Sequence, residues 1–578
     1  MNRLDRRAGR RRVLGVALAG GAAAFAAACG GSKDDKGSSA TAVKQDVTAA
    51  ASTRVAETAQ PKPGGTISVR QSANSPLDPH VNSSFTAQTL AGYVYARLLK
   101  YKTGADPLAA DAYDVEGDLA EGFETPSGDG MTVTFKLRGN AKWQDIAPVS
   151  GRTVDSEDVK FSLERFRTDP KSTNRGVFGT PQAPLVESLE TPDARTVVFK
   201  LAKPFAPFKT LVTNPNYLWI MPKEIGAGGF DSGKQMIGAG PFILDSTQPD
   251  IAYKVRKNPT YYAAPMPYID GVNLVIITEE AQEVAQFQAG RLDIAAIPPG
   301  SAPEVRKNVA KAELIEYVPT TYGFMAFQQR GDSPYKDARI RQAASMALDR
   351  EGVLSLAYEG KGAWNTAIPS QFRRFRIDPK TDDIGAGAPF FKHNPAEAKK
   401  LLAAAGYPNG LPIRFIFTNN IYGERFNSVA EAIVGMLKEG GFQPTIATQD
   451  YLREYITPGT GTYFGNFEGM FYGLSTDFND PHDYLYNMHS SKSPRNHAGV
   501  NDAQLDAMLD KEERTINDDE RVKVVKDIQR YLGEKLYYVP GAIGPTYIGV
   551  QPWVKNYQRN NSYGSGSESR AKVWIDKS

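Results

Sequence analysis

Cysteine is almost absent from this sequence: Cys29 is the single cysteine among 578 residues. One thiol excludes an internal disulfide framework, a cysteine-based zinc site and a redox-active cysteine pair. The stability of the folded part must therefore come from its packed core.

Histidine is also scarce, and recognisable catalytic motifs are missing. The five histidines form no His-x-x-x-His pair, no Gly-x-Ser-x-Gly elbow is present, and residues 238–241 (GAGP) are too short for a phosphate loop. We therefore expect no enzymatic activity, no catalytic residue, no resident metal and no cofactor. His482, His489 and His497 lie close together in the sequence; a shared metal is one interpretation, and three surface histidines in a polar loop is the one their spacing favours.

The clearest apolar run, residues 13–28, is shorter than the about 20 residues that a membrane-spanning helix needs. Six arginines precede it, which is typical of a signal peptide over residues 1–28. A permanent membrane span is the alternative. The adjacent arginines favour twin-arginine export, and Sec export stays open.

Cys29 stands where a signal peptide would be cleaved. Ala26, Ala27 and Ala28 precede it and Gly30 follows, an arrangement that resembles a bacterial lipobox with Ala26 in place of the usual leucine. We expect a lipid on Cys29, with more than one acyl chain because one chain anchors only marginally. A buried structural thiol is the alternative. The expected location is extracytoplasmic, at the outer face of the cytoplasmic membrane.

Basic charge is concentrated in the predicted signal. The whole chain has a net charge of +3, whereas removal of residues 1–28 leaves 62 basic and 64 acidic residues, a net charge of −2. Nothing in this distribution indicates a nucleic-acid partner. Residues 29–61 are rich in Ser, Ala, Thr, Lys and Asp and predict a flexible tether that spans about 30 Å.

The remaining residues predict a mixed α/β fold. Strand-like runs at residues 66–69, 131–137, 195–201, 271–277, 413–417 and 445–448 alternate with helical segments. Asn394, Pro395 and Gly406 mark the start and end of one helix, and Asp155 caps another. Residues 413–448 predict a β-α-β unit, and residues 131–137 and 195–201 predict a separate, smaller antiparallel sheet.

One segment has the chemistry of a binding surface. Residues 467–482 (FEGMFYGLSTDFNDPH) combine an aromatic strand, Gly473 and, just beyond, Asp477. Such a strand can form the floor for an extended ligand with a cationic end. The alternative is a core strand that runs into an Asn-Asp-Pro turn, with Asp480 as a turn residue.

Ordered short motifs cover the chain from residue 64 to about residue 543. They are GGTISV (64–69), PLDPH (76–80), FKLR (135–138), KWQD (142–145), DSEDVKFSL (155–163), GAGPF (238–242), KNPTYY (257–262), DARIRQA (337–343), NPAEAKKLL (394–402), AGYPNG (405–410) and DFNDP (477–481). In this order they resemble the family 5 extracellular solute-binding proteins, the dipeptide and oligopeptide binders of bacterial ABC transporters.

The resemblance implies a two-lobed fold of the type II periplasmic-binding-protein kind with an extra inserted domain. Lobe I would take residues 62–100, 201–317 and 546–578, the inserted domain residues 101–200, and lobe II residues 318–545. The hinge would then lie near Val318 and Gly544.

The resemblance also implies the ligand contacts. Asp477 matches the family's acid for a peptide α-ammonium, and Gly473, Leu474 and Ser475 match its peptide-pairing strand. Leu474 replaces the family's tryptophan, and Phe471 stands where some members carry a basic residue, so recognition of a ligand carboxylate stays open. Phe85, Tyr322 and Trp364 are further expected contacts.

The implied function is ligand capture for an ABC permease with its ATPase subunits, by a monomer anchored to the membrane through lipid. A peptide or similar amine-bearing solute is the leading ligand. A sugar, an opine-like compound or a nickel chelate is the alternative, the last because of Asp480 and His482. A ligand-sensing receptor without import is a third reading.

Replacing Cys29 tests the anchor. The Cys29→Ser variant should appear in the soluble fraction or keep its signal peptide, because the lipidated thiol is lost. Fractionation and intact-mass measurement check this, and an unchanged membrane fraction with unchanged mass would contradict the anchor.

Overall fold

The computed structural model describes residues 58–103, 115–125, 128–172, 174–180, 183–457, 459–559 and 563–577. Residues 1–57, with the predicted signal peptide, Cys29 and most of the tether, lie outside the described residues. Within the described part, no helix has the length and apolar character that a membrane crossing requires.

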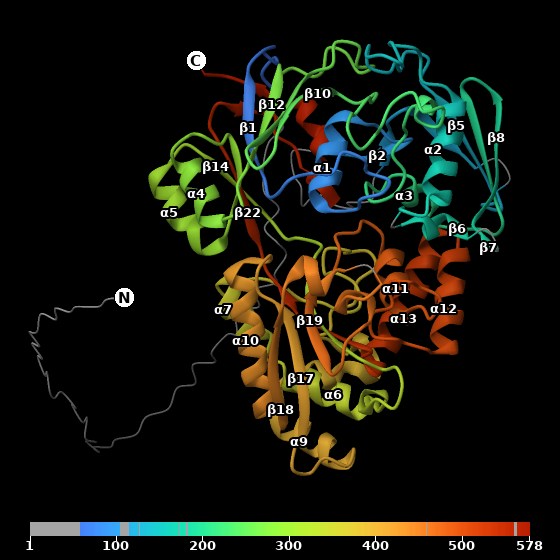
Figure 1. Ribbon diagram of the computed structural model, residues 1–578. Helices are drawn as coiled ribbons and strands as arrows, with labels where there is room; N and C mark the ends of the chain where they lie inside the picture. Colours follow the sequence, from blue (N-terminus) through green and yellow to red (C-terminus); the bar gives the residue numbers. More distant parts are fainter. Residues whose placement is uncertain are drawn as a thin grey trace, which may run out of the picture. The chain divides into compact units, whose positions relative to one another are not determined.

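The largest sheet has seven strands in the order β10-β11-β12-β1-β13-β22-β14. Their bounds are β1 (Thr66–Gln71), β10 (Phe242–Gln248), β11 (Ala252–Lys257), β12 (Gly271–Ile276), β13 (Ile294–Ile297), β14 (Glu313–Tyr317) and β22 (Thr546–Val550). The central strand β1 runs parallel to β12 and β13, whereas the outer pairs are antiparallel. With helices α1 (Phe85–Val94), α4 (Glu280–Gln288) and α5 (Ala302–Asn308), this sheet forms lobe I, the upper part of Figure 1.

The second sheet has five strands in the order β18-β17-β19-β15-β20 and forms lobe II. Its strands are β15 (Gly323–Phe327), β17 (Leu411–Thr418), β18 (Phe442–Gln449), β19 (Met470–Leu474) and β20 (Tyr538–Pro540). Helix α10 (Gly423–Glu439) joins the parallel strands β17 and β18, which confirms the predicted β-α-β unit.

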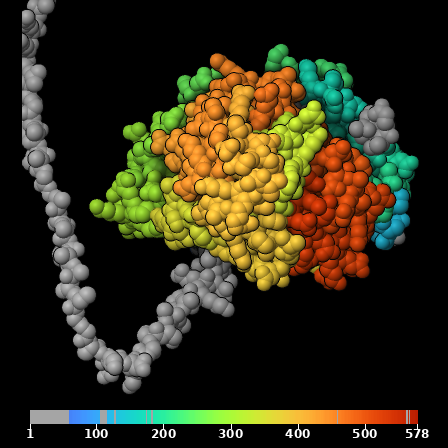
Figure 2. All heavy atoms as spheres, turned by 90° about the horizontal axis from the view of Figure 1, so that it is seen from below, coloured from blue at the N-terminus to red at the C-terminus, as the bar shows by residue number. Residues whose placement is uncertain are grey.

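Alternate side chains of the five-stranded sheet enter two different cores, as strand geometry requires. One face packs on α6 (Ala338–Ala347), α7 (Arg350–Tyr358), α9 (Pro395–Ala404) and α10. The other face packs on α11 (Pro481–His489), α12 (Ala503–Arg514) and α13 (Asp518–Lys535). Seen from below, the yellow-to-red residues of lobe II cover most of the visible surface (Figure 2).

A four-stranded antiparallel sheet, β4-β5-β9-β8, forms the inserted domain with α2 (Ser156–Thr168) packed on it. Its strands are β4 (Ala120–Glu124), β5 (Thr132–Leu137), β8 (Val186–Asp193) and β9 (Thr196–Leu201). The small antiparallel sheet predicted from residues 131–137 and 195–201 is thereby confirmed.

The remaining elements are short. They are β2 (Leu99–Tyr101), β3 (Val115–Gly117), β6 (Gly179–Thr180), β7 (Ala183–Pro184), β16 (Ala363–Trp364), β21 (Ala542–Ile543), β23 (Val554–Lys555), β24 (Trp574–Ile575), α3 (Phe208–Leu211), α8 (Ala388–Phe391), η1 (Arg175–Phe178), η2 (Lys223–Ile225), η3 (Pro299–Ser301), η4 (Pro334–Lys336), η5 (Asp382–Gly387), η6 (Tyr451–Tyr455), η7 (Thr462–Phe464) and η8 (Tyr563–Lys572).

The chain passes between the two large sheets twice. It enters the five-stranded sheet between β14 and β15 and returns between β21 and β22. In Figure 1, β14 and β22 run from the upper sheet toward the lower one. These two connections join the lobes.

Two helix starts follow the sequence signals. The Asn394 side chain accepts a hydrogen bond from the backbone N of Glu397 at 3.1 Å at the start of α9, and Pro395 is its first residue. Asp155 and Asp158 form a reciprocal capping box at the start of α2. Local capping chemistry thus sets both helix boundaries.

A buried ionic network joins α11, α12 and α13. Arg521 pairs with Asp480, and its Nε donates to Glu512 Oε1 at 2.7 Å. Glu512 Oε2 lies 2.6 Å from His482 Nδ1. Burial raises the pKa of Asp480, but Arg521 outweighs it and holds that pKa below its ordinary value.

This network corrects two expectations. Asp480 is the N-cap of α11 and a buried ion-pair partner, so it is more than a turn residue. His482, His489 and His497 are buried, not exposed in a polar loop. His482 and His489 lie on α11, where burial against α12 and the five-stranded sheet outweighs their polarity.

Removing Asp480 tests the network. Asp480→Ala leaves Arg521 buried with one of its two carboxylates and removes a helix cap, so the free energy of unfolding should fall by about 3–5 kcal/mol. Denaturant unfolding followed by circular dichroism measures it.

Asp527→Ala is the matched control, because Asp527 forms an exposed pair with Arg530 at 2.8 Å. Loss of such a surface pair should cost about 1 kcal/mol or less. Equal losses in the two variants would show that the buried network adds nothing.

Candidate ligand-binding cleft

A large cleft is lined by residues of both lobes and of the inserted domain. Its volume is about 2890 Å³, and its walls include α1, the loop before α10, and the segment from β19 into α11. Pockets for drug-sized molecules usually measure about 300–1,000 Å³. The cleft therefore has room for an extended ligand.

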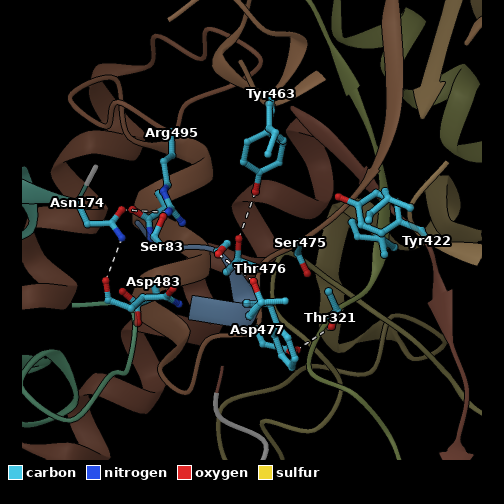
Figure 3. A pocket seen from close by; sticks show the side chains of 18 of the residues that line it. Ser83, Asn174, Thr321, Tyr422, Tyr463, Ser475, Thr476, Asp477, Asp483 and Arg495 are labelled. Carbon is cyan, nitrogen blue, oxygen red and sulfur yellow. Dashed lines mark hydrogen bonds between the residues drawn. The ribbon is translucent and has the colours of Figure 1, made fainter. Parts of the chain in front are cut away.

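Asp477 enters this cleft just beyond the end of β19. Thr320 and Thr321 donate their hydroxyl hydrogens to its Oδ1, at 2.9 and 2.7 Å. Its second oxygen, Oδ2, accepts no hydrogen bond from any described residue. The half-buried carboxylate is thus held by one oxygen and open at the other (Figure 3).

The backbone at Leu474 has a free edge. Ser475 N donates to Tyr322 O at 3.0 Å, so Ser475 turns its backbone toward β15. Gly323, opposite Leu474, turns its own carbonyl away, toward Gly541 N at 2.8 Å. Because backbone groups alternate along a strand, Leu474 directs its N–H and C=O to the side opposite β15.

The neighbouring strand does not cover this edge. β17 pairs with β19 only at Met470 and Phe471. Leu474 itself is half-buried and lines the cleft, as does Ser475. Among the described strands, the ladder between β17 and β19 thus stops three residues before Leu474, and the Leu474 backbone groups face the side of β19 away from β15.

Three other predicted contacts lie outside the lining of the cleft. Phe471, on β19, is fully buried against the core that contains α11, α12 and α13. Tyr322 is also buried, and its hydroxyl donates to Ala367 O at 3.1 Å. Trp364 packs beside Lys380 and Arg350 on the opposite core. Among the described residues these three do not line the cleft.

Gly473 also has a different role from the one expected. A Cβ there would collide with the Tyr455 hydroxyl oxygen, so the glycine makes room for a packed side chain of lobe II. Phe85, by contrast, lines the cleft from the start of α1.

Apolar side chains gather at the cleft. Of nine exposed large apolar residues in the described part of the chain, five line it: Phe85, Leu356, Ile421, Leu452 and Phe464. Exposed apolar groups concentrated in one concave surface mark a binding site. Apart from Phe85, the sequence analysis missed them, because most lie in loops and short turns that carry no periodic pattern.

A second polar group lies in the same cleft. Arg495 Nη2 donates to Asn174 Oδ1 at 3.0 Å, and Tyr217 donates its hydroxyl to Asp483 Oδ1 at 3.1 Å. Figure 3 shows Arg495, Asn174 and Asp483 as one group and Asp477, Thr321 and Thr476 as another. Both bonds cross between lobe II and the rest of the protein.

Asp483 has an unusual pKa. Burial raises the pKa of its carboxyl to about 7. The negative charge of Asp480 raises this pKa further, whereas His482 and Arg495 lower it. The carboxyl is therefore partly protonated near neutral pH. Its partner Tyr217 belongs to the segment after β9 that touches lobe II.

The Asp483→Asn variant tests this pKa. A folded-state pKa of about 7 lies above the ordinary value of about 3.9, so ionisation destabilises the native state progressively between about pH 4 and pH 7. Relative to the parent, the variant should therefore gain thermal stability between pH 5 and pH 8. His482, Asp480, Tyr217 and Arg495 remain in both proteins, so the difference isolates Asp483. A difference that is the same at both pH values would rule out the raised pKa.

Sequence relatives match most of the chain. The chain is 26% identical over 487 residues to heme-binding protein A of Haemophilus influenzae, covering 80% of this chain and 84% of that protein. It is 25% identical over 537 residues to a probable di/tripeptide-binding protein of Pseudomonas aeruginosa, covering 89% and 97%.

Solved structures agree in fold. AgaA from A. tumefacien R10, in complex with agropinic acid, superposes with a TM-score of 0.73 at 25% identity, covering 89% of this chain and 99% of that one. The oligopeptide-binding protein AppA of Bacillus subtilis, solved with a nonapeptide, gives a TM-score of 0.74 at 19% identity, covering 90% and 100%.

The model of the bacterial extracellular solute-binding proteins, family 5 Middle, matches residues 114–496. This match spans more than half of the chain and includes the inserted domain and most of lobe II. The chain therefore belongs to family 5 of the bacterial extracellular solute-binding proteins, which bind solutes for ABC transporters and are not enzymes.

Proposed function

We propose that this protein captures a peptide or similar amine-bearing solute in its cleft and passes it to an ABC permease, while a lipid on Cys29 holds it at the membrane. The observation that carries the proposal is the open oxygen of Asp477 at the end of an unpaired strand edge.

Asp477 suits an ammonium group. Thr320 and Thr321 donate to one carboxylate oxygen, which fixes the orientation of the carboxylate and leaves Oδ2 without a hydrogen bond from a described residue, in a side chain that lines the cleft. A hydrogen bond between a carboxylate and a ligand ammonium contributes about 1.5–3 kcal/mol, more than a bond between neutral groups. A ligand amine is thus the natural partner of this oxygen.

The free backbone groups of Leu474 suit a peptide. An extended peptide can pair with an exposed strand edge through main-chain hydrogen bonds, while its side chains enter pockets. Leu474 lies three residues before Asp477, so an amine at Asp477 and a backbone pair at Leu474 can belong to one ligand. We retain Leu474 as a strand contact on this basis; Ser475 also lines the cleft, but its backbone N–H donates to Tyr322 O.

The apolar lining favours a ligand with apolar side chains. Leu356, Ile421, Leu452, Phe464 and Phe85 offer a surface that a sugar or a nickel chelate would leave largely unused. An opine-like compound is the second candidate, because AgaA, which was solved with agropinic acid, matches at 25% identity over nearly its whole length.

The tripeptide Leu-Leu-Leu and its N-acetyl derivative test the role of Asp477. Asp477→Ala should weaken binding of Leu-Leu-Leu by about 10-fold to more than 100-fold, because the ligand ammonium loses its charged partner. The N-acetyl peptide should bind the parent protein similarly weakly and lose little more in the variant. Isothermal calorimetry measures all four affinities.

Glu439→Gln is the control, since it removes an exposed carboxylate at the far end of α10 and outside the cleft. Its affinity for Leu-Leu-Leu should equal that of the parent. If N-acetylation changes affinity less than about threefold, Asp477 is not the amine anchor. Tight binding of agropinic acid without any binding of Leu-Leu-Leu would select the opine.

A further inference from the structure

The cleft has six lysine and arginine residues among the described residues that line it. Three are neutralised by the protein: Arg70 pairs with Glu283, Lys203 with Glu513, and Arg514 with Asp510. The other three, Arg425, Lys492 and Arg495, form no ion pair with a described residue. These three are the candidates for binding an anionic group of the ligand.

Of the three, Arg495 is the one whose side chain is hydrogen-bonded to a described residue of the wall, whereas the Arg425 guanidinium only stacks near the Tyr358 ring, 5.1 Å from its centre. Its Nη2 donates to Asn174 Oδ1 at 3.0 Å, and its guanidinium lies 5.7 Å from the ring centre of Phe478. Asn174 is buried and fixed in turn, because its Nδ2 donates to Asn216 O at 3.0 Å. Arg495 is half-buried, whereas Arg425 and Lys492 are exposed.

The partners of Arg495 leave its charge available. An amide and an aromatic ring orient a guanidinium without neutralising it, and its Nε and Nη1 donate to no described residue. Asp483 is the nearby acid that interacts with it, and burial raises the pKa of that carboxyl to about 7. Near neutral pH the acid is therefore partly uncharged, and the group as a whole remains positive.

We propose that Arg495 binds a carboxylate of the ligand whose amine is bound by Asp477. The ligand is then zwitterionic, with its two charged ends bound by two separate polar groups of the same cleft. The planar guanidinium with two free donor positions suits a carboxylate. This inference rests on the proposed function, since it assumes that one ligand reaches both groups.

The assignment explains how a ligand carboxylate can be bound although Phe471 stands where some family members carry a basic residue. That side chain is buried in the core of lobe II and cannot reach a ligand. Arg495 instead supplies the cation from the segment between α11 and α12 of lobe II, and it lines the same cleft as Asp477.

The C-terminal amide of Leu-Leu-Leu tests the proposal. Amidation removes the carboxylate, so the amide should bind the parent protein about 10-fold to 100-fold more weakly than the free acid. In the Arg495→Gln variant, the affinity for the free acid should fall to that for the amide, so that the two affinities differ by less than about threefold. Calorimetry on both proteins gives this cycle.

Lys492→Gln is the matched control, because Lys492 is an exposed, unpaired cation three residues away in the same segment. It should keep the full difference between acid and amide. The proposal is overturned if amidation leaves the parent's affinity unchanged, if neither form binds, or if Lys492→Gln abolishes the difference as fully as Arg495→Gln.

The two assignments fail separately. A penalty for N-acetylation without a penalty for amidation supports Asp477 and removes Arg495. A penalty for amidation that persists in Arg495→Gln also removes Arg495. Thermal unfolding of unliganded Arg495→Gln at the parent's midpoint shows that a loss of binding does not come from unfolding.

Discussion

The antiparallel pairing of β15 with β19 is the constraint on which the cleft depends. Phe324 and Phe471 bury it on one face, and Met325 and Tyr472 bury it on the other. This pairing fixes where β19 ends and hence where Asp477 emerges. It also turns the Leu474 backbone away from β15. Ser475 N, the next residue, donates to Tyr322 O, and the Gly323 carbonyl opposite Leu474 accepts from Gly541 N. A shift of one residue in register would exchange these directions.

The same pairing couples the site to the connection between the lobes. Thr320 and Thr321, which hold Asp477 Oδ1, lie in the segment that joins β14 of lobe I to β15 of lobe II. Any rotation of one lobe on the other must change backbone angles in such a connection. The orientation of the acid and the relative position of the lobes therefore depend on the same few residues.

Local signals in the sequence were sufficient for several helices and strands. The caps at Asn394 and Asp155, the β-α-β unit and the small antiparallel sheet follow from hydrophobic period and capping chemistry. Asp477, Leu474, Ser475 and Phe85, which line the cleft, were expected from the family resemblance. Tyr322 and Trp364 lie outside the lining of the cleft among the described residues, because an aromatic side chain fits a core as well as a ligand, and the tertiary fold decides which face it meets.

Asp480 and the histidines show a second limit of the sequence. A carboxylate before proline has the same local pattern whether it faces water or a buried arginine, and Arg521 lies about forty residues away in the chain. Burial of Asp480 and His482 is tolerated only because Arg521 and Glu512 neutralise them. Such pairing is set by packing of α11 on α12 and α13, which hydrophobic periodicity alone does not specify.

The distribution of charges separates the framework from the binding surface. Lys203 and Arg521 form ion pairs with Glu513 and Glu512, which connect different elements of the protein. Exchanging either partner for a ligand would break an ion pair that stabilises the fold. Asp477 and Arg495 are oriented instead by neutral groups, two hydroxyls in one case and an amide with a ring in the other. Each side chain also interacts electrostatically with one opposite charge, Asp477 with Arg559 and Arg495 with the partly protonated Asp483. Their hydrogen-bond partners are nevertheless neutral and hold them in place before a ligand binds, which lowers the entropy cost of binding. A ligand with opposite charges at its two ends is the chemistry that this arrangement is prepared to receive.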